Sequence, residues 1–465
     1  MISMDRFPNI VAACVIVFAS TARIDAAEPA KPNIIFIMAD DLGYGDLGCY
    51  GQQEIQTPHL DGMAREGTRF LQAYAGSTGC APSRCCLMTG VHNGHARIRD
   101  NIPHGTFLHD DDVTLAEVLK PAGYRTGAIG KWSLGVHGSE GKPNDQGFDD
   151  WFGHLDQDQA HFYYPHYLWD NDRIKLLYGN RAEKRGEYTH DLFTERALDF
   201  IEQSGDGPFF LYLAYTIPHW SDFPGDTPES LIVPSDAPYT DCDWPQVEKN
   251  YAAMITRMDR DVGRILALLK KQGIDDNTIV FFTSDNGPCA TASQSHRPKF
   301  FNSRGPFRGQ KRDLYEAGIR VPMIVRWPGH VPAGKESDQV WAFWDVMPTL
   351  AELAGTSAPE STDGISLAPA VLGKPQAKEH DYLYWDYGHS RGNFMQAIRM
   401  GDWKGIRNGI GAEIELYNLA ADPGERHNLA GEHPEIVEQI DNAMQDSLVE
   451  TPAYPILRPE EVKGR

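Results

Sequence analysis

Two uninterrupted apolar runs, each followed by acidic or amide residues, constrain the fold of this chain most strongly. The first is IIFIM at residues 34–38, which leads into Asp40 and Asp41. The second is IVFFT near the middle of the chain, which leads into Asp285 and Asn286. Apolar runs without alternation are typical of strands that are buried on both faces of a parallel sheet. The sequence therefore predicts an α/β fold in which two strand ends carry acidic and amide side chains.

Other patterns extend this sheet. Apolar residues recur at spacings of three and four between residues 251 and 269, which predicts an amphipathic helix that Gly273 ends. Short apolar runs at 209–214 and 323–327 add candidate strands, and the first of them leads toward His219. Because helical patterns separate several of these runs, we expect a large, mostly parallel central sheet flanked by helices. Sites in such sheets lie at the carboxyl ends of the strands.

The pattern changes from about residue 376. Three runs with partial strand alternation, DYLYWDY, MQAIRMGDWKGIR and AEIELYNL, precede a predicted helix over residues 434–448. They predict a smaller C-terminal antiparallel sheet with one helix. We therefore expect a catalytic α/β domain over residues 28–375 and a C-terminal α+β subdomain over residues 376–465.

The N-terminus has the features of a secretory signal peptide over residues 1–27. Arg6 supplies a short basic region, residues 10–19 are apolar, and small residues that suit cleavage follow. The motif around Cys14 imitates a lipoprotein signal, but most of the apolar run follows this cysteine. No later segment is long and apolar enough for a transmembrane helix, so we expect an exported protein, periplasmic or secreted. The formal net charge of −22 argues against nucleic acid or an anionic membrane surface as a partner.

Residues 79–90, GCAPSRCCLMTG, hold three of the six cysteines that remain after removal of the signal peptide. Six cysteines can all pair in an exported protein, but Cys85 and Cys86 are adjacent, and so few in so long a chain do not form a disulfide scaffold. A zinc site prefers Cys-x2-Cys pairs with further ligands at set spacing, which this segment lacks. The third interpretation is one reactive residue, Cys80, followed by two small thiols that pack in a helix.

Asp40, Asp41, Asp285 and Asn286 offer only oxygen ligands, three of them anionic. Such a set suits a hard cation, Ca2+ or Mg2+, better than zinc or copper. The competing interpretation is that these side chains cap helices or turns, as Asp residues at loop tips often do.

Several blocks in the chain resemble, in order, the formylglycine-dependent sulfatases of the alkaline-phosphatase superfamily. CAPSR at 80–84 continues to LMTG and matches the family's Cys-x-Pro-Ser-Arg signature, and AGYRTGAIGKW at 122–132 matches its second signature. MADDLG, TSDNG, the PH of IPHW and GQKRDLYEAGIRVP at 309–322 match further blocks. DWK at 402–404 and LYNLAADPGERHNL at 416–429 match the C-terminal pattern. Each block alone is weak, but together they cover nearly all of the mature chain.

The resemblance implies a sulfatase whose Cys80 is oxidised to formylglycine by a maturation enzyme. One hydroxyl of the aldehyde hydrate attacks sulfur and displaces the alcohol, and loss of a proton from the other hydroxyl then expels sulfate. The cation implied is Ca2+, with Mg2+ as the alternative, and it lowers the pKa of the attacking hydroxyl. The implied metal ligands are Asp40, Asp41, Asp285, Asn286 and the modified Cys80.

The same resemblance assigns roles to four other side chains. Arg84 steadies the hydrate near the metal carboxylates. Lys131 and Lys311 bind sulfate oxygens, where a compact ammonium suits a tetrahedral anion. His219 holds the sulfate and helps to protonate the leaving oxygen. Taken singly, each of these residues is as ordinary as a solvated lysine or a packed histidine, and the ordered blocks are what favour the catalytic interpretation.

One position departs from the family pattern. The family continues Gly-Lys-Trp with His, which supports the nucleophile, whereas this chain has Ser133. Serine forms hydrogen bonds but does not hold a proton at neutral pH as imidazole does. Either another base substitutes, with His137 the nearest in sequence, or sulfate leaves with weaker assistance. We predict that Ser133→His keeps activity.

The implied substrate is a sulfated carbohydrate. Trp220, Trp385, Tyr387 and His389 are candidates to bind a sugar, or else to pack in the core. The alternatives are an aryl sulfate sulfatase, a phosphonate monoester or phosphodiester hydrolase of the same superfamily, and an inactive binder of sulfated glycans. The set of two lysines and a histidine favours sulfate.

Overall fold

The two apolar runs predicted as buried strands lie side by side in the middle of a large sheet. β1 (Asn33–Asp40) pairs in parallel with β7 (Phe209–Pro218) on one side and with β8 (Thr278–Ser284) on the other. β3 (Arg125–Lys131) continues the parallel pairing beyond β7, and β4 (Asp150–His154) follows β3. Because these five strands are parallel, their carboxyl ends lie along one edge of the sheet.

Six further strands complete the sheet, and four of their six pairings are antiparallel. β9 (Arg320–Arg326) lies between β8 and β2 (Thr68–Tyr74) and is antiparallel to both, while β10 (Lys335–Ser337) and β11 (Trp341–Ala342) pair with β2 in parallel. At the opposite edge, β5 (Tyr167–Asp170) and β6 (Arg173–Leu176) form an antiparallel ribbon beside β4. The eleven strands follow the order β10-β2-β9-β8-β1-β7-β3-β4-β5-β6, with β11 paired to β2. The predicted mostly parallel centre is confirmed.

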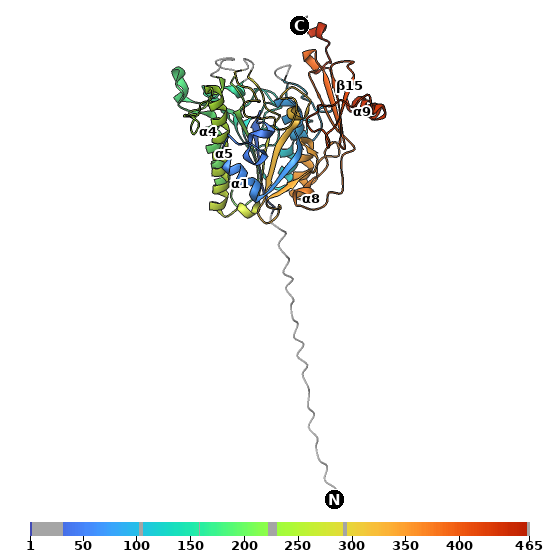
Figure 1. The fold of residues 1–465 in the computed structure, drawn as a ribbon. Coiled ribbons are helices and arrows are strands. Elements are labelled where there is room, and N and C mark those ends of the chain that lie inside the picture. Colours follow the sequence, from blue (N-terminus) through green and yellow to red (C-terminus); the bar gives the residue numbers. More distant parts are fainter. Residues whose placement is uncertain (2–30, 102–105, 158, 222–229, 292–294, 463–465) are drawn as a thin grey trace. The chain divides into compact units, whose positions relative to one another are not determined.

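Side chains of β1 alternate between two cores. Ile35 and Ile37 face a layer of α1 (Pro58–Glu66), α4 (Thr189–Glu202) and α5 (Gln246–Gln272). Residues 34, 36 and 38 face the other core, which involves α2 (Cys80–Thr89), α3 (Leu115–Leu119), α7 (Val346–Leu353) and the C-terminal sheet. Figure 1 shows α1, α4 and α5 on one side of the sheet and the C-terminal elements on the other. Burial on both faces explains why the apolar run of β1 has no polar alternation.

The predicted amphipathic helix is α5, and it ends as expected. Gly273 follows its last residue with a φ of 71° and donates its backbone N–H to the carbonyl groups of Leu269 and Lys270. A residue with a side chain is strained in that left-handed conformation, so glycine is suited to end the helix here.

The C-terminal part forms a separate four-stranded antiparallel sheet, as predicted. Its strands are β12 (Leu383–Tyr387), β13 (Met395–Met400), β14 (Trp403–Asn408) and β15 (Ile414–Asn418). Three runs were expected and four strands form, because Gly401, with a φ of 58°, turns the chain between β13 and β14. The predicted final helix is α9 (Pro434–Ser447), which packs on this sheet through Ile440 and Met444.

The computed structural model describes Met1 and residues 31–462, except 102–105, 158, 222–229 and 292–294. The predicted signal peptide beyond Met1 therefore lies outside the described residues. Within the described part, no helix has both the length and the apolar character needed to cross a bilayer. The boundary predicted at 375/376 falls between α8 (Ala368–Val371) and β12 and stays a prediction.

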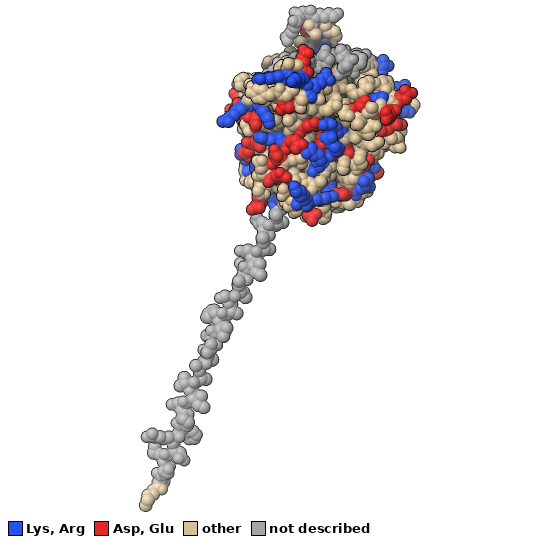
Figure 2. Space-filling model, turned by 90° about the vertical axis from the view of Figure 1, so that its left-hand side faces the viewer, with Lys and Arg blue, Asp and Glu red and all other residues tan. Residues whose placement is uncertain are grey.

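Acidic and basic residues are interspersed on the face that carries α4 and α5 (Figure 2). Ion pairs join neighbouring side chains there, such as Arg257 with Asp191 at 2.6 Å and Arg264 with Glu195 at 2.7 Å. A mixed surface of this kind serves solubility and offers no single-sign field for a polyanion.

Candidate active site

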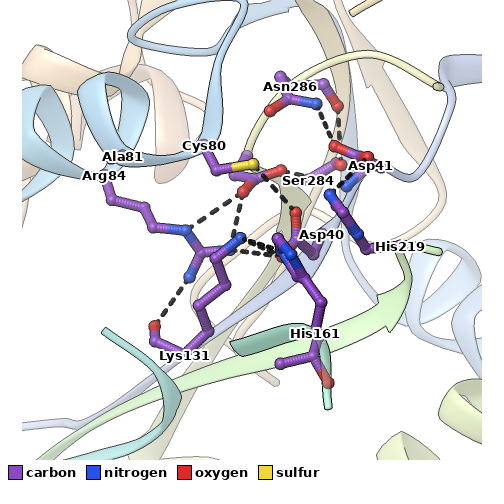
Figure 3. Close-up of polar contacts among 12 residues, drawn as sticks. Asp40, Asp41, Cys80, Ala81, Arg84, Lys131, His161, His219, Ser284 and Asn286 are labelled. Atoms are coloured by element: carbon purple, nitrogen blue, oxygen red, sulfur yellow. Dashed lines mark hydrogen bonds and ion pairs between the residues drawn. The ribbon is translucent and has the colours of Figure 1, made fainter. Parts of the chain in front are cut away.

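The acidic and amide residues predicted to share a site do converge at the carboxyl edge of the sheet. Asp40 is the last residue of β1, Asp41 follows with a φ of 64°, and Asp285 and Asn286 follow β8. The backbone N–H of Asp41 donates to Asp285 Oδ1 at 3.1 Å, and Asn286 Nδ2 donates to Asp41 Oδ1 at 2.7 Å. All four side chains are buried, and Figure 3 shows Asp40, Asp41 and Asn286 around Cys80. The hydrogen bonds bring strand ends that are 244 residues apart in the chain into one cluster.

Helix α2 presents Cys80 and Arg84 to this cluster. Cys80 is its first residue, and Arg84 follows about one turn later, so both side chains point to the same side. Cys80 Sγ lies 3.4 Å from Asp40 Oδ1. The guanidinium of Arg84 donates to Asp285 Oδ2 at 2.7 Å and to the carbonyl oxygen of Lys131 at 2.9 Å, and it lies 3.7 Å from Asp40. Arg84 therefore ties α2, β3 and β8 together beneath the cysteine.

Three further predicted residues surround the cysteine. Lys131 Nζ donates to Asp40 Oδ2 at 2.7 Å, and Lys311 Nζ donates to Asp41 Oδ1 at 2.5 Å and to Cys80 Sγ at 2.9 Å. His219 Nε2 lies 3.4 Å from Asp41 Oδ2. All nine site residues predicted from sequence thus meet in one buried cluster. Their roles in catalysis are taken up below.

The residue before Lys131 in β3 must be a glycine. Gly130 has a φ of 107°, and a Cβ there would lie 1.9 Å from the carbonyl oxygen of Ala214 on β7. Neither the conformation nor the contact admits a side chain without a shift of the backbone. This position explains the glycine of the GKW block physically.

The cluster also contains His161, which the sequence analysis did not identify. It lies in the short helical turn η4 (Gln159–His161), and its Nε2 is 3.1 Å from Lys131 Nζ. Its ring stacks on that of His219 with a centroid distance of 3.6 Å and an interplanar angle of 7°. Figure 3 shows the rings of His161 and His219 side by side near the ammonium group of Lys131.

Ser133 and His137 are placed differently from what the family pattern suggests. Ser133 is buried with a φ of 64°, and its Oγ has no hydrogen-bond partner among the described residues. His137, the nearest alternative base in sequence, is exposed and stacks on Trp169 at 5.0 Å. Among the described residues, no hydrogen bond or ion pair joins His137 to the acidic residues of the cluster, so the geometry gives no support to the alternative in which His137 is the base.

The charges in the cluster shift one another's pKa values. Burial alone would raise the pKa of Asp40, but Lys131, His219 and Arg84 hold it well below the usual range. For Asp285, burial and the neighbouring Asp40 raise the pKa to about 6 in spite of Arg84. Burial and Asp40 also raise the pKa of the Cys80 thiol to about 12, so an unmodified Cys80 is a neutral thiol and a poor nucleophile at pH 7.

The donor set fits a hard divalent cation. Three carboxylates and one amide crowd together, and Asp41 Oδ2 and Asn286 Oδ1 are buried oxygens without a hydrogen-bond partner among the described residues. Buried oxygens without donors are what a cation would satisfy. Asp40, Asp41, Cys80 and His219 also offer ligand atoms within 4.8 Å of one another. The alternative of simple turn caps does not account for the unpartnered oxygens.

The cysteines of the described residues are all free, which removes the disulfide interpretation for them. Cys85 and Cys86 are fully buried in α2 and belong to the core between α2 and the sheet, so the predicted packing role is confirmed. The charged neighbours of Cys80 are the carboxylates of Asp40 and Asp285 and the ammonium groups of Lys131 and Lys311, which is unlike the Cys and His ligands of a structural zinc site.

Comparison with known proteins relates this cluster to one enzyme family. The family model described as sulfatase matches residues 32–356, a span that contains every residue of the cluster. This chain belongs to the sulfatase family. It is a sulfuric ester hydrolase of the alkaline-phosphatase-like superfamily, as the resemblance implied. A second family model, the C-terminal part of N-sulphoglucosamine sulphohydrolase, matches residues 307–453 of this sulfatase.

Curated relatives and solved structures agree with this membership. N-acetylgalactosamine-6-sulfatase of Sus scrofa is 33% identical over 457 residues, covering 86% of this chain and 82% of the relative. N-acetylgalactosamine-6-O-sulfatase of Bacteroides thetaiotaomicron is 31% identical, covering 89% and 93%. The solved structure of Ps i-CgsB in complex with k-i-k-neocarrahexaose is 30% identical, with a TM-score of 0.79 and coverage of 93% and 96%. The names of these two curated relatives refer to N-acetylgalactosamine, and the solved complex contains k-i-k-neocarrahexaose, whereas a further relative is named steryl-sulfatase.

Proposed function

We propose that this sulfatase acts on a sulfated carbohydrate and that its nucleophile is a formylglycine hydrate derived from Cys80. The observation that carries the proposal is the position of Cys80, which begins α2 in contact with Asp40 and Lys311 at a buried set of oxygen ligands. A neutral thiol there would be a poor nucleophile, whereas an aldehyde hydrate offers two hydroxyls on one carbon. The carbohydrate class is supported by the names of the relatives, which include an N-acetylgalactosamine-6-sulfatase.

The residues around Cys80 have complementary tasks in this proposal. A Ca2+ or Mg2+ ion held by Asp40, Asp41, Asp285 and Asn286 would lower the pKa of the attacking hydroxyl and draw charge from a sulfate oxygen. Arg84 fixes α2 against Asp285 and so positions the nucleophile. The ammonium groups of Lys131 and Lys311 donate to Asp40 and Asp41, and their remaining N–H groups would bind sulfate oxygens beside these carboxylates.

His219 has a suitable orientation for the leaving group. Its Nδ1 lies 2.5 Å from the carbonyl oxygen of Trp220, so Nδ1 carries the proton that this hydrogen bond requires, and Nε2 faces the cluster. Burial lowers the pKa of His219, with Lys311 and Lys131 opposing the effect of Asp41. A bound, negatively charged sulfate ester would favour the protonated form of this ring, which suits a group that binds sulfate and protonates the departing oxygen.

The proposal includes an export route and a maturation partner. The features of residues 1–27 support a periplasmic or secreted location, and formylglycine formation needs an enzyme that oxidises Cys80. The aromatic residues considered for sugar binding differ in their surroundings. Trp385, Tyr387 and His389 are buried, and Trp385 donates to the carbonyl oxygen of Ala75, so Trp385 serves the core, while Trp220 is only half-buried and remains the candidate for sugar contact.

The nucleophile is tested by peptide mass spectrometry of active protein. Conversion of Cys80 to the aldehyde replaces sulfur by oxygen with loss of two hydrogens, so the peptide mass falls by about 18 Da. An aminooxy reagent should label that peptide, and Cys80→Ala should abolish both labelling and turnover. Unmodified Cys80 in protein of full specific activity would contradict the proposed chemistry.

The substrate class is tested by comparing turnover of three groups of compounds. We expect defined sulfated mono- and oligosaccharides, N-acetylgalactosamine 6-sulfate among them, to be hydrolysed with higher kcat/KM than an aryl sulfate. An aryl phosphodiester should be the poorest substrate, because two lysines and a histidine match the sulfate oxygens. Preference for the phosphodiester would instead assign the chain's activity to the phosphonate and phosphodiester branch, and preference for the aryl sulfate would remove the carbohydrate assignment.

A further inference from the structure

The ammonium group of Lys131 is held from two sides. Asp40 Oδ2 accepts from Nζ at 2.7 Å, and His161 Nε2 lies 3.1 Å from the same nitrogen. An ammonium group has only donors, so His161 Nε2 must be the acceptor, and the proton of this imidazole is on Nδ1. Two acceptors leave one N–H of Lys131 to point elsewhere. His161 therefore restricts the direction in which Lys131 can meet an anion.

His161 also fixes the plane of the other histidine. Its ring lies 3.6 Å from the ring of His219 with an interplanar angle of 7°, while Nδ1 of His219 is held by the carbonyl oxygen of Trp220. A ring that is stacked on one face and hydrogen-bonded at one edge cannot rotate without losing both contacts. The stack thus orients Nε2 of His219 toward Asp41.

The turn that carries His161 is joined to the segment that carries His219. Ser221 Oγ donates to the carbonyl oxygen of His161 at 2.7 Å, and Tyr163 Oη donates to the carbonyl oxygens of Thr216, at 3.0 Å, and of His219. Ser221 and Tyr163 are both buried. These bonds connect η4 to the end of β7, so the position of His161 relative to His219 is set by the fold rather than by a single side chain.

Ser133, the residue after the GKW block, does not itself orient Lys131 or His219 by a hydrogen bond. Ser133 has a short side chain, and its Oγ finds no hydrogen-bond partner in the described part of the chain. His137 lies at the surface against Trp169. His161, which lies 30 residues after Lys131 in the chain, is instead within hydrogen-bonding distance of the Lys131 ammonium group.

We propose that His161 is a positioning residue for sulfate, which orients Lys131 and His219 and so supplies the imidazole that Ser133 does not provide. The proposal rests on the proposed function, because it assigns Lys131 and His219 to the sulfate oxygens. In the family pattern the imidazole follows the end of β3, at the position of Ser133. Here it comes from the turn between β4 and β5. The role is positional because His161 acts through two other side chains.

The test compares His161→Ala, His161→Gln and the control His137→Ala in protein whose formylglycine content has been measured. Kinetics with 4-nitrophenyl sulfate give kcat and KM, and inhibition by inorganic sulfate gives its Ki. We expect His161→Ala to lose about 100-fold in kcat/KM, the effect of misplacing binding groups, and to raise the Ki for sulfate. His161→Gln should recover a large part of that loss, because its side-chain carbonyl can accept from Lys131. His137→Ala should match the parent.

Two results would overturn the inference. One is a His161→Ala enzyme whose kcat, KM and sulfate Ki stay within about two-fold of the parent. His161 would then make no measurable contribution to sulfate binding or turnover. The other is equal loss of activity in the Ala and Gln variants with an equal fall in thermal midpoint, which would indicate a structural role only. A parent without turnover of any sulfate ester would contradict the proposed function instead. In that case the stabilisation of parent and variants by inorganic sulfate, read as a thermal shift, still tests His161.

Discussion

His154 is a buried imidazole that the proposed chemistry does not use. It ends β4 opposite Lys131 on β3, it is fully buried, and neither ring nitrogen has a hydrogen-bond partner among the described residues. Burial and the charge of Lys131 lower the pKa of His154 to about 3. The unfolded chain binds a proton on this residue near pH 6.5 and the native chain does not, so native stability falls as the pH drops below that value.

We expect His154→Leu to reduce this acid sensitivity. At pH 4.5 the neutral histidine costs about 3 kcal/mol of unfolding free energy relative to pH 7, and the leucine variant lacks that cost. Urea unfolding followed by tryptophan fluorescence between pH 4.5 and 7.5 measures the difference. His137→Leu is the matched control, because His137 is exposed. Parallel pH profiles of parent and His154→Leu would show that His154 is not the group that titrates.

Ser133 is the second residue at which the site can be tested directly. Its φ of 64° lies in the left-handed region, where histidine is tolerated better than branched residues. With His161 already in contact with Lys131, we expect Ser133→His to keep activity within about ten-fold of the parent. Steady-state kinetics on a sulfate ester provide the measurement. Loss of all turnover with an unchanged thermal midpoint would mean that the pocket is built around the serine.

Sequence predicts those residues of the site that lie in continuous blocks. Asp40 ends a buried strand, Asp285 follows one, and Cys80 begins a helix. Linear patterns in the sequence therefore mark all three, and the parallel strands bring them together. His161 lacks such a pattern. It lies in a short turn, and its role depends on stacking against His219, a contact that no local spacing encodes. His137, the alternative base named because it is nearest in sequence, is exposed and stacks on Trp169, since proximity in sequence does not fix the direction of a side chain.

At the scale of elements, a buried ion network anchors the C-terminal sheet to the loop that carries Lys311. Lys404 on β14 pairs with Glu316 Oε1 and with Glu425 Oε1, each at 2.9 Å, and all three side chains are fully buried. The backbone N–H of Glu316 donates to Glu425 Oε2 at 2.7 Å. This network gives the DWK and GERHNL blocks a structural explanation, because they supply its lysine and one of its acids.

Lys404→Met should therefore weaken both stability and activity. Glu316 keeps its ion pair with Arg320 at 3.0 Å, but Glu425 loses its cation, and leaving a buried carboxylate unpaired costs up to about 3–5 kcal/mol. We also expect a lower kcat, because the loop that positions Lys311 loses its anchor. The control is Arg407→Met on the same strand, whose pair with Asp441 is partly exposed and contributes less than about 1 kcal/mol. Equal melting curves for the two variants would contradict this account.

Elements with a strong apolar period were predictable and those with mixed faces were not. The uninterrupted runs of β1, β7 and β8 and the helical spacing of α5 and α9 identify those five elements. β5 and β6 were missed because an edge ribbon with one exposed strand lacks a clear pattern: every residue of β6 is exposed. The antiparallel direction of β9 was also missed, because an apolar run indicates that a strand is buried but not which way it runs.

At the scale of the whole molecule, removal of divalent cations tests the predicted metal centre. We expect chelation to abolish turnover and lower the thermal midpoint, and Ca2+ to restore both. Saturation at about 100 times the dissociation constant corresponds to about 2.7 kcal/mol of added stability. The variant Asp285→Asn should show little Ca2+-dependent shift, because it lacks one of the three carboxylates. A chelated protein with unchanged activity and midpoint would exclude a required cation.

Truncation at residue 375 tests whether the two sheets are independent. Residues 31–465 group into one compact unit, and Trp385 packs on Trp344 at 5.6 Å and on Tyr74 at 5.2 Å, in the core of the central sheet. We expect a chain that ends at 375 to be insoluble or to bind a hydrophobic dye, because this aromatic core would be open to water. Deletion of residues 459–465 is the control, since the described residues of α10 (Pro459–Val462) include none that are buried. A soluble, cooperatively melting 375-residue chain would show instead that the catalytic part folds alone.

The complete burial of Cys80 has a consequence for the order of events in the cell. If Cys80 is converted to formylglycine as proposed, the maturation enzyme needs access to a residue that the folded protein encloses in the first turn of α2. Under that proposal, oxidation of Cys80 and folding of the chain around it would compete with each other. The active fraction of the population is then set by a ratio of two rates, so a substitution that only speeds folding can lower specific activity without touching the site.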